Sequence, residues 1–262
     1  MERSSLCYAC FEVKTMLYDM IFKRKSFHIF MDIGHIEDTE LRQIEACYDT
    51  LVPLVPNIRT AMRIVPAAET TCKRGQEYCI LLYSEQKPGY LQNIGYLGQQ
   101  LDLYLASRDI GALWFGIGKV EEAQYNGLAF VIMIAIAKMP KGKFRKNMFK
   151  SKRKPLEEIW HGAAIEGVSD IVRFSPSACN TQPWLVQREK DMLIVYRYQK
   201  PGKRGIMPKD RVIYYNQIDL GIFLLILELC LQHEGIPFER ELFFDDGDQN
   251  RELTKTAEYR LT

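Results

Sequence analysis

One ten-residue stretch, Ser175-Pro-Ser-Ala-Cys-Asn-Thr-Gln-Pro-Trp184, concentrates groups that could bind a ligand. It combines hydroxyls, backbone donors, a small residue, carboxamides and an aromatic wall. That mixture suits a flat aromatic ligand with polar edges better than it suits a simple connection. The alternative is a structural loop between a helix and a strand. In either case we expect Trp184 to anchor the turn in the core rather than to contact a ligand.

A second group of residues could bind a phosphate. Lys23, Arg24 and Lys25 are followed by Ser26 and, two positions later, by His28. Three cations and a hydroxyl on one turn can hold a phosphate through charge-assisted hydrogen bonds. The alternative is a solvated surface turn, which is what most basic clusters are.

Two further segments carry possible chemistry. Residues 109–116 include Gly111, Trp114 and Gly116, at a predicted passage from a helix into a strand. Residues 138–154 form a connector with nine Lys or Arg and no acid. Its charge and interleaved aromatics are compatible with a nucleic-acid patch, and equally with a solvated loop.

Taken together, these motifs resemble those of the FMN-dependent nitroreductase family. Arg24, Lys25 and Ser26 match the first three positions of an Arg-Arg-Ser-x-Arg motif that holds the FMN phosphate in that family. His28 stands where a second arginine is usual, and an unperturbed histidine is mostly uncharged at neutral pH. The departure therefore weakens the expected grip on the phosphate.

The resemblance also assigns residues to the rest of the flavin site. The connector ends in an Arg-Lys-Pro-Leu-Glu-Glu stretch whose cations, Arg153 and Lys154, are implied to close over the phosphate. Gly111, Trp114 and Gly116 match a Gly-Leu-Gly-x-x-Trp-x-Gly segment whose backbone amides can tune the flavin. The residues implied at the ring are Pro176, Ser177, Ala178 and Asn180 of the loop, and Ala112, Leu113 and Trp114 of the strand.

The elements that must position these residues follow from hydrophobic periodicity, caps and breakers. Gly111 and Gly235 are read as the glycines that end two helices. We predict an α+β protein with helices over 15–22, 38–51 (capped by Asp38), 89–107, 156–174 and 220–233, and strands over 78–83, 128–137, 185–187, 192–198 and 238–244.

The pattern of an apolar helix that ends before an apolar strand occurs twice, which suggests a duplication. The phosphate-like turn occurs only in the first half and the Ser175–Trp184 loop only in the second. The resemblance therefore implies a nitroreductase-like fold in which two helix and antiparallel-sheet halves form a pseudo-dimer within one chain. The predicted parts are an N-terminal extension (1–15), a first half (16–155), a second half (156–250) and a polar tail (251–262).

Composition limits the class of protein. The 262 residues are 47% hydrophobic and 26% charged, with net charge +2, so no general attraction to nucleic acid or membranes is implied. Seven cysteines without a disulfide framework indicate a reducing compartment. Cys7 and Cys10 form a lone Cys-x-x-Cys pair, and the sequence offers no second pair of ligands for a zinc site. Charged residues near the start leave no signal peptide. We expect a cytoplasmic protein.

The expected activity is transfer of hydride from NAD(P)H through FMN to a nitroaromatic, a quinone or a similar small acceptor. The expected molecule is a monomer with one flavin site and no metal, nucleic-acid or membrane partner. Two alternatives stay open. One is a flavin-binding or sensor protein of the same fold with little turnover, and the other is nucleic-acid binding through residues 138–154.

Overall fold

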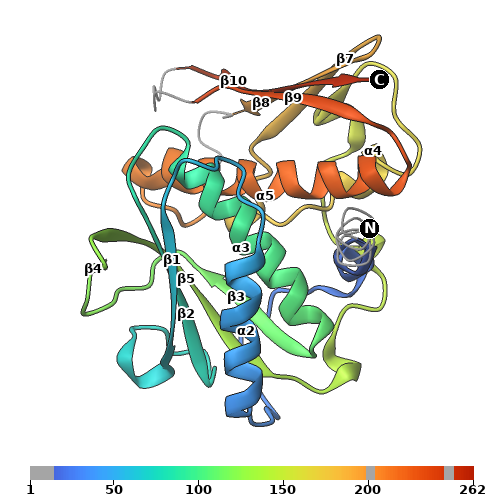
Figure 1. Ribbon diagram of the computed structural model, residues 1–262. Helices are drawn as coiled ribbons and strands as arrows, with labels where there is room; N and C mark the ends of the chain where they lie inside the picture. Colours follow the sequence, from blue (N-terminus) through green and yellow to red (C-terminus); the bar gives the residue numbers. More distant parts are fainter. Residues whose placement is uncertain (1–14, 199–203, 245–250) are drawn as a thin grey trace, which may run out of the picture. The chain divides into compact units, whose positions relative to one another are not determined.

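The computed structural model describes residues 15–198, 204–244 and 251–262 (Figure 1). The chain forms two compact units. The first contains residues up to Tyr90 together with Leu97–Met148, and the second contains Leu91–Tyr96 together with Phe149–Thr262. The second of these segments of the first unit ends at Met148, whereas the sequence predicted that the first half ends at residue 155. Residues 15–23 are helical as predicted, whereas most of the predicted extension and the Cys7–Cys10 pair lie outside the described residues.

The first unit is an antiparallel sheet with helices. The sheet has the order β1-β2-β5-β3, and β4 adds to β5. Glu37, rather than the predicted Asp38, is the N-cap of α2, where it forms a capping box with Glu40. The elements are α2 (Asp38–Thr50), β1 (Thr60–Pro66), β2 (Tyr78–Ser84), α3 (Tyr90–Ser107), β3 (Ile110–Phe115), β4 (Gln124–Tyr125) and β5 (Leu128–Lys138).

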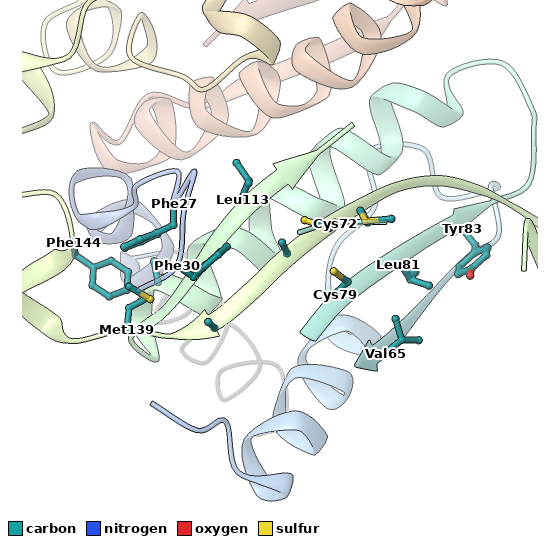
Figure 2. Close-up of a cluster of buried hydrophobic side chains, with 14 of the residues drawn as sticks. Phe27, Phe30, Val65, Cys72, Cys79, Leu81, Tyr83, Leu113, Met139 and Phe144 are labelled. Carbon is teal, nitrogen blue, oxygen red and sulfur yellow. The ribbon is translucent and has the colours of Figure 1, made fainter. Parts of the chain in front are cut away.

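The core of the first unit explains the long apolar runs of β2 and β5. Side chains on one face of the sheet, including Cys79, Leu81 and Tyr83, pack with Phe27 and Phe144 in a buried cluster (Figure 2). Residues between them in sequence, which point to the opposite face, are also buried. Both faces of the sheet are therefore covered, which explains why β2 and β5 are continuous apolar runs in the sequence.

The second unit contains a sheet of order β6-β7-β8-β10-β9, in which only β6 pairs in parallel. Its long helix α5 begins eight residues before the predicted start, because Val212, Ile213 and Tyr215 are already buried. The elements are β6 (Trp160–His161), α4 (Ser169–Val172), β7 (Trp184–Glu189), β8 (Met192–Tyr198), α5 (Val212–His233), β9 (Phe238–Leu242) and β10 (Leu253–Leu261).

Three predicted assignments are wrong. The helix over 156–174 is replaced by short turns, β6 and the four-residue α4, because Gly162 and Gly167 take positive φ angles that interrupt a helix. The polar tail is strand β10, which lies between β8 and β9 and buries Ala257 and Tyr259. Strand β1 was not predicted, because Arg63 and the flanking prolines obscure its short alternation.

The duplication is visible in the order of strands. In the first unit two paired strands precede α3, and the two strands after it complete the order β1-β2-β5-β3. In the second unit β7 and β8 precede α5, and the strands after it complete the order β7-β8-β10-β9. Two units with one connectivity confirm the predicted internal repeat.

A constant shift in sequence relates residues of the two central helices. It places Gly95 on Gly221 and the end of α3 on the end of α5. A Cβ on Gly95 would overlap the carbonyl oxygen of Ile218, and a Cβ on Gly221 would overlap that of Gln92. Gln92 and Ile218 are themselves related by the same shift, so the contact between the helices is reciprocal, as in an isologous interface.

The same shift corrects the role of Gly111. The residue that corresponds to Gly235, which ends α5 at φ +66°, is Asp109, which follows α3 at φ +57°. Aspartate is one of the few residues other than glycine that enters this conformation readily. Gly111 instead lies in β3, where a Cβ would press on Phe27 and Met139.

Candidate functional site

The basic turn after the first helix is built around a buried ion pair. The Arg24 guanidinium is 4% exposed and donates from Nε to Asp102 Oδ2 over 2.8 Å. The Trp114 indole nitrogen donates to the same oxygen over 2.9 Å. Asp102 on α3 therefore connects two segments that the sequence singled out separately, and the sequence analysis missed it because a lone acid in an apolar helix carries no motif.

Arg24 also determines what Ser26 can do. Arg24 Nη2 donates to Ser26 Oγ over 3.0 Å. With its oxygen accepting that bond, the Ser26 hydroxyl hydrogen is directed elsewhere and can be donated to an anion. Lys25 is exposed, and its Nζ donates to the Lys143 carbonyl over 3.1 Å. His28 is exposed as well. Lys25 and Ser26 are thus the groups of this turn best suited to a phosphate.

Strand β3 is brought to the same turn. Ser26 forms a parallel bridge with Ala112, and the Phe27 N–H donates to the Ala112 carbonyl over 3.1 Å. Ala112 and Leu113 are only 2% and 6% exposed, so little of either residue is open to a ligand. Backbone polar groups of residues two positions apart point to the same edge of a strand. The Ala112 carbonyl points away from β5, so the backbone N–H of Trp114 does so too. It is positioned as a donor at the sheet edge.

The loop of the second unit is held by its own polar residues. Ser177 Oγ accepts from the Gln182 N–H over 3.0 Å, so its hydroxyl hydrogen can be directed to a ligand. Trp184 is fully buried and stacks on Phe223 with ring centroids 4.8 Å apart. This confirms the expectation that Trp184 packs in the core and anchors the loop there.

The end of the basic connector is tied to this loop. Arg153 Nη1 donates to Asn180 Oδ1 over 2.8 Å, and the Lys154 N–H donates to Gln182 Oε1 over 2.9 Å. Lys154 Nζ also donates to the Gln182 carbonyl over 2.8 Å. The structure therefore brings together the connector and the loop, two motifs that are about 25 residues apart in the sequence.

A buried acid under the loop also escaped the sequence analysis. Asp219 on α5 is 3% exposed and accepts the Ala178 N–H with both carboxyl oxygens, at 3.0 and 3.1 Å. Burial raises the pKa of its carboxyl to about 8, and the hydrogen bond from Ala178 offsets only part of that shift. No sequence signal distinguishes it from other polar residues of the helix.

Three other cations of the connector have acidic partners on the chain. Lys138 pairs with Glu40 and Lys143 with Asp32, and Lys141 lies 4.0 Å from Asp109. Such pairing reduces the free positive charge that a nucleic-acid patch would need. Among the described residues, no group of three or more His, Cys, Asp or Glu could hold a metal ion.

Comparison with known proteins establishes the family. The family model described as "Putative TM nitroreductase" matches residues 16–230. The chain therefore belongs to this nitroreductase family, and the expected nitroreductase-like fold is confirmed. Among curated proteins no match to the chain was found.

The chain is similar to solved structures that include the following three, the first of which matches nearly the whole chain. A nitroreductase-like protein of Thermotoga maritima MSB8 is 15% identical, with a TM-score of 0.59, and the match covers 94% of this chain and 93% of that one. A Desulfovibrio desulfuricans nitroreductase in complex with FMN is 18% identical, with a TM-score of 0.42 and 57% and 97% covered. A nitroreductase family protein of Clostridium difficile 630 is 12% identical, with a TM-score of 0.45 and 57% and 97% covered.

One helical stretch, Lys209–His233, is long and apolar enough to cross a membrane by length and composition, with a mean hydropathy of 1.5. Its most apolar window is 89% buried within the structure. It contains the whole of α5, which has buried residues on all sides along its length. A helix that is apolar all round is what the core of a large unit requires.

Proposed function

We propose that this protein is an FMN-dependent oxidoreductase that passes hydride from NAD(P)H to a nitroaromatic, a quinone or a similar small acceptor. Membership of the nitroreductase family supports the reaction class. The observation that carries the cofactor assignment is the hydrogen bonding of two serine hydroxyls. Ser26 and Ser177 each accept a hydrogen bond from the protein, so each can donate its own hydrogen to an anionic or carbonyl oxygen.

The phosphate end of FMN is assigned to the first-unit turn. Lys25 supplies a mobile exposed charge and Ser26 a hydroxyl donor, while Arg24 holds Ser26 and stays paired with Asp102. Arg153 and Lys154 remain proposed as further cations for the phosphate. In the structure Arg153 donates to the Asn180 side chain and to the Lys152 and Phe174 carbonyls, so binding of a phosphate by Arg153 would compete with these bonds.

The ring of FMN is assigned to β3 and to the second-unit loop. The Trp114 N–H at the edge of β3 can donate to a ring acceptor, and Ser177 can donate from the loop. Pro176 and Ala178 are partly exposed and small enough to pack against a flat surface. FMN, when bound, supplies the hydride chemistry, and the protein orients the ring and sets its electronics through these hydrogen bonds.

The absorbance spectrum of the purified protein tests this assignment. After incubation with FMN and dialysis, we expect visible flavin bands shifted from those of free FMN, at about one flavin per chain. Steady-state oxidation of NADH and NADPH, with a quinone or a nitroaromatic as acceptor, then tests turnover. A colourless protein after dialysis would rule out the cofactor assignment.

A flavin-binding protein with little turnover is the second candidate. His28, where the family has an arginine, and the Gly111-Ala112-Leu113 step, where leucine and glycine are common after the first glycine, favour it. Retained flavin without NAD(P)H oxidation would select this function. A cytoplasmic location and a monomeric state remain part of the proposal.

A further inference from the structure

The conformation of the Ser175–Trp184 loop is costly for the residues that form it. Cys179, Asn180 and Gln182 have φ angles of +50°, +54° and +49°, although none of them is glycine. Each such residue costs roughly 1 kcal/mol or more, because its Cβ crowds the backbone. A loop of this kind keeps its shape only if surrounding contacts impose it.

Those contacts act on different parts of the loop. Arg153 binds Asn180, and Lys154 binds Gln182, so the connector fixes the second half of the loop. Asp219 reaches the first half from α5, through the Ala178 N–H. The segment 176–178, which is proposed to face the flavin, is therefore bound to the helix core through this carboxyl.

Asp219 is an unfavourable residue for its position if only stability is considered. It is 3% exposed on a helix whose neighbouring residues, Ile218 and Leu220, are buried and apolar. One backbone N–H satisfies few of the lone pairs of a carboxyl group, and a buried carboxyl with poor compensation is destabilising. A leucine has the same branched skeleton and lacks the polar atoms that carry this cost.

We propose that Asp219 is a positioning residue for the flavin, which holds the 176–178 segment in its ligand-binding shape by accepting the Ala178 N–H. The inference rests on the proposed function and extends it. It also changes the role of Ala178. Its N–H is directed at Asp219, so Ala178 offers the flavin a small side-chain surface and no backbone donor.

The test compares two substitutions of Asp219. Asp219→Asn keeps an oxygen that can accept the Ala178 N–H, whereas Asp219→Leu keeps only the branched shape. We expect Asp219→Leu to raise the Kd for FMN about tenfold or more, in line with loss of a buried hydrogen bond, and to alter the flavin absorbance bands. We expect Asp219→Asn to stay within about threefold of wild type. Thermal unfolding without FMN should show no loss of stability in Asp219→Leu.

A third substitution approaches the same bond from the loop. Ala178→Pro removes the N–H donor, and Ser177 before it is already extended (φ −148°, ψ 156°), as a residue before proline must be. If Asp219 acts through this N–H, the double variant Asp219→Leu, Ala178→Pro should lose no more FMN affinity than either single variant. This arm carries the test alone if Asp219→Leu does not fold. Asn216→Leu, a buried polar residue one turn earlier on α5, is the matched control.

Each outcome decides the matter. Weak FMN binding in Asp219→Leu and Ala178→Pro, with near-normal binding in Asp219→Asn and Asn216→Leu, supports the inference. Equal FMN affinity and equal spectra in wild type, Asp219→Leu and Ala178→Pro overturn it while the proposed function stands. A wild-type protein that binds no FMN overturns the inference and the proposed function together.

Discussion

At the scale of single residues, neighbouring cations have different roles. Arg24 and Lys25 are adjacent in the sequence, yet Arg24 is buried against Asp102 and Lys25 is exposed. Sequence alone gave both the same role at the phosphate. The difference arises because α3 delivers a buried acid to one of them only.

Substitution of the two cations should separate stability from binding. Arg24→Ala leaves Asp102 buried with only Trp114 as a partner, so we expect a loss of about 3–5 kcal/mol in the free energy of unfolding, and weaker FMN binding because Ser26 loses its support. Lys25→Ala should change stability by less than about 0.5 kcal/mol and lower FMN affinity. Urea unfolding and FMN titration measure both. Unchanged FMN affinity in both variants would remove the phosphate assignment.

Asp219 should make the protein less stable as the pH rises. Burial raises the pKa of its carboxyl from 3.8 to about 8, so between these values the folded protein keeps a proton that the unfolded chain releases. Its contribution is therefore complete below pH 3.8 and is lost as the pH rises towards 8. We expect Asp219→Asn, which cannot ionise, to show a smaller fall in Tm between about pH 5 and about pH 8. Equal slopes in the two proteins would contradict this assignment.

At the scale of elements, the crossing of α3 and α5 depends on two glycines. Gly95 and Gly221 allow each helix to approach the backbone of the other. The helices also carry corresponding acids, since the shift that relates the glycines places Asp102 on Glu228. Asp102 accepts from Trp114 of β3, and Glu228 accepts from Arg240 of β9 over 2.5 Å, at corresponding positions of the two strands.

Adding one methyl group at the crossing should test its tightness. In Gly221→Ala the new Cβ would overlap the Gln92 carbonyl oxygen, so the two helices would have to separate. We expect a loss of about 1–3 kcal/mol or more, as in other overpacked cores. Gly142→Ala is the control, because nothing lies within 4 Å of a Cβ there. Denaturant unfolding of both variants gives the comparison, and equal stability would show that the helices can move apart.

At the scale of the whole molecule, duplication has kept the connectivity and let the residues diverge. The acid of the first unit pairs with Arg24 of the phosphate-like turn. Its counterpart Glu228 also accepts from Tyr96 and Tyr259, at 2.8 and 2.7 Å, in a buried cluster. One copy of the position thus adjoins the proposed cofactor site, and the other is closed by protein groups.

This divergence predicts one FMN per chain. Titration of the protein with FMN should saturate at about one equivalent, and sedimentation analysis should give the mass of one 30.5 kDa chain. Two equivalents per chain would show that the second half has kept a working site. A stable dimer would show that the internal duplication does not replace association between chains.

Local sequence was enough to predict the family, the long apolar elements and the segments of the proposed site, because periodicity and local motifs are properties of neighbouring residues. Strands β2 and β5, helix α3 and the loop before Trp184 were found in this way. The partner that each polar residue receives depends on the packing of distant segments. Asp102 and Asp219 carry no local signal, since their roles arise from residues 78 and 41 positions away. Strand β10 was missed for the same reason: many of its side chains are polar, and its place between β8 and β9 is set by long-range pairing.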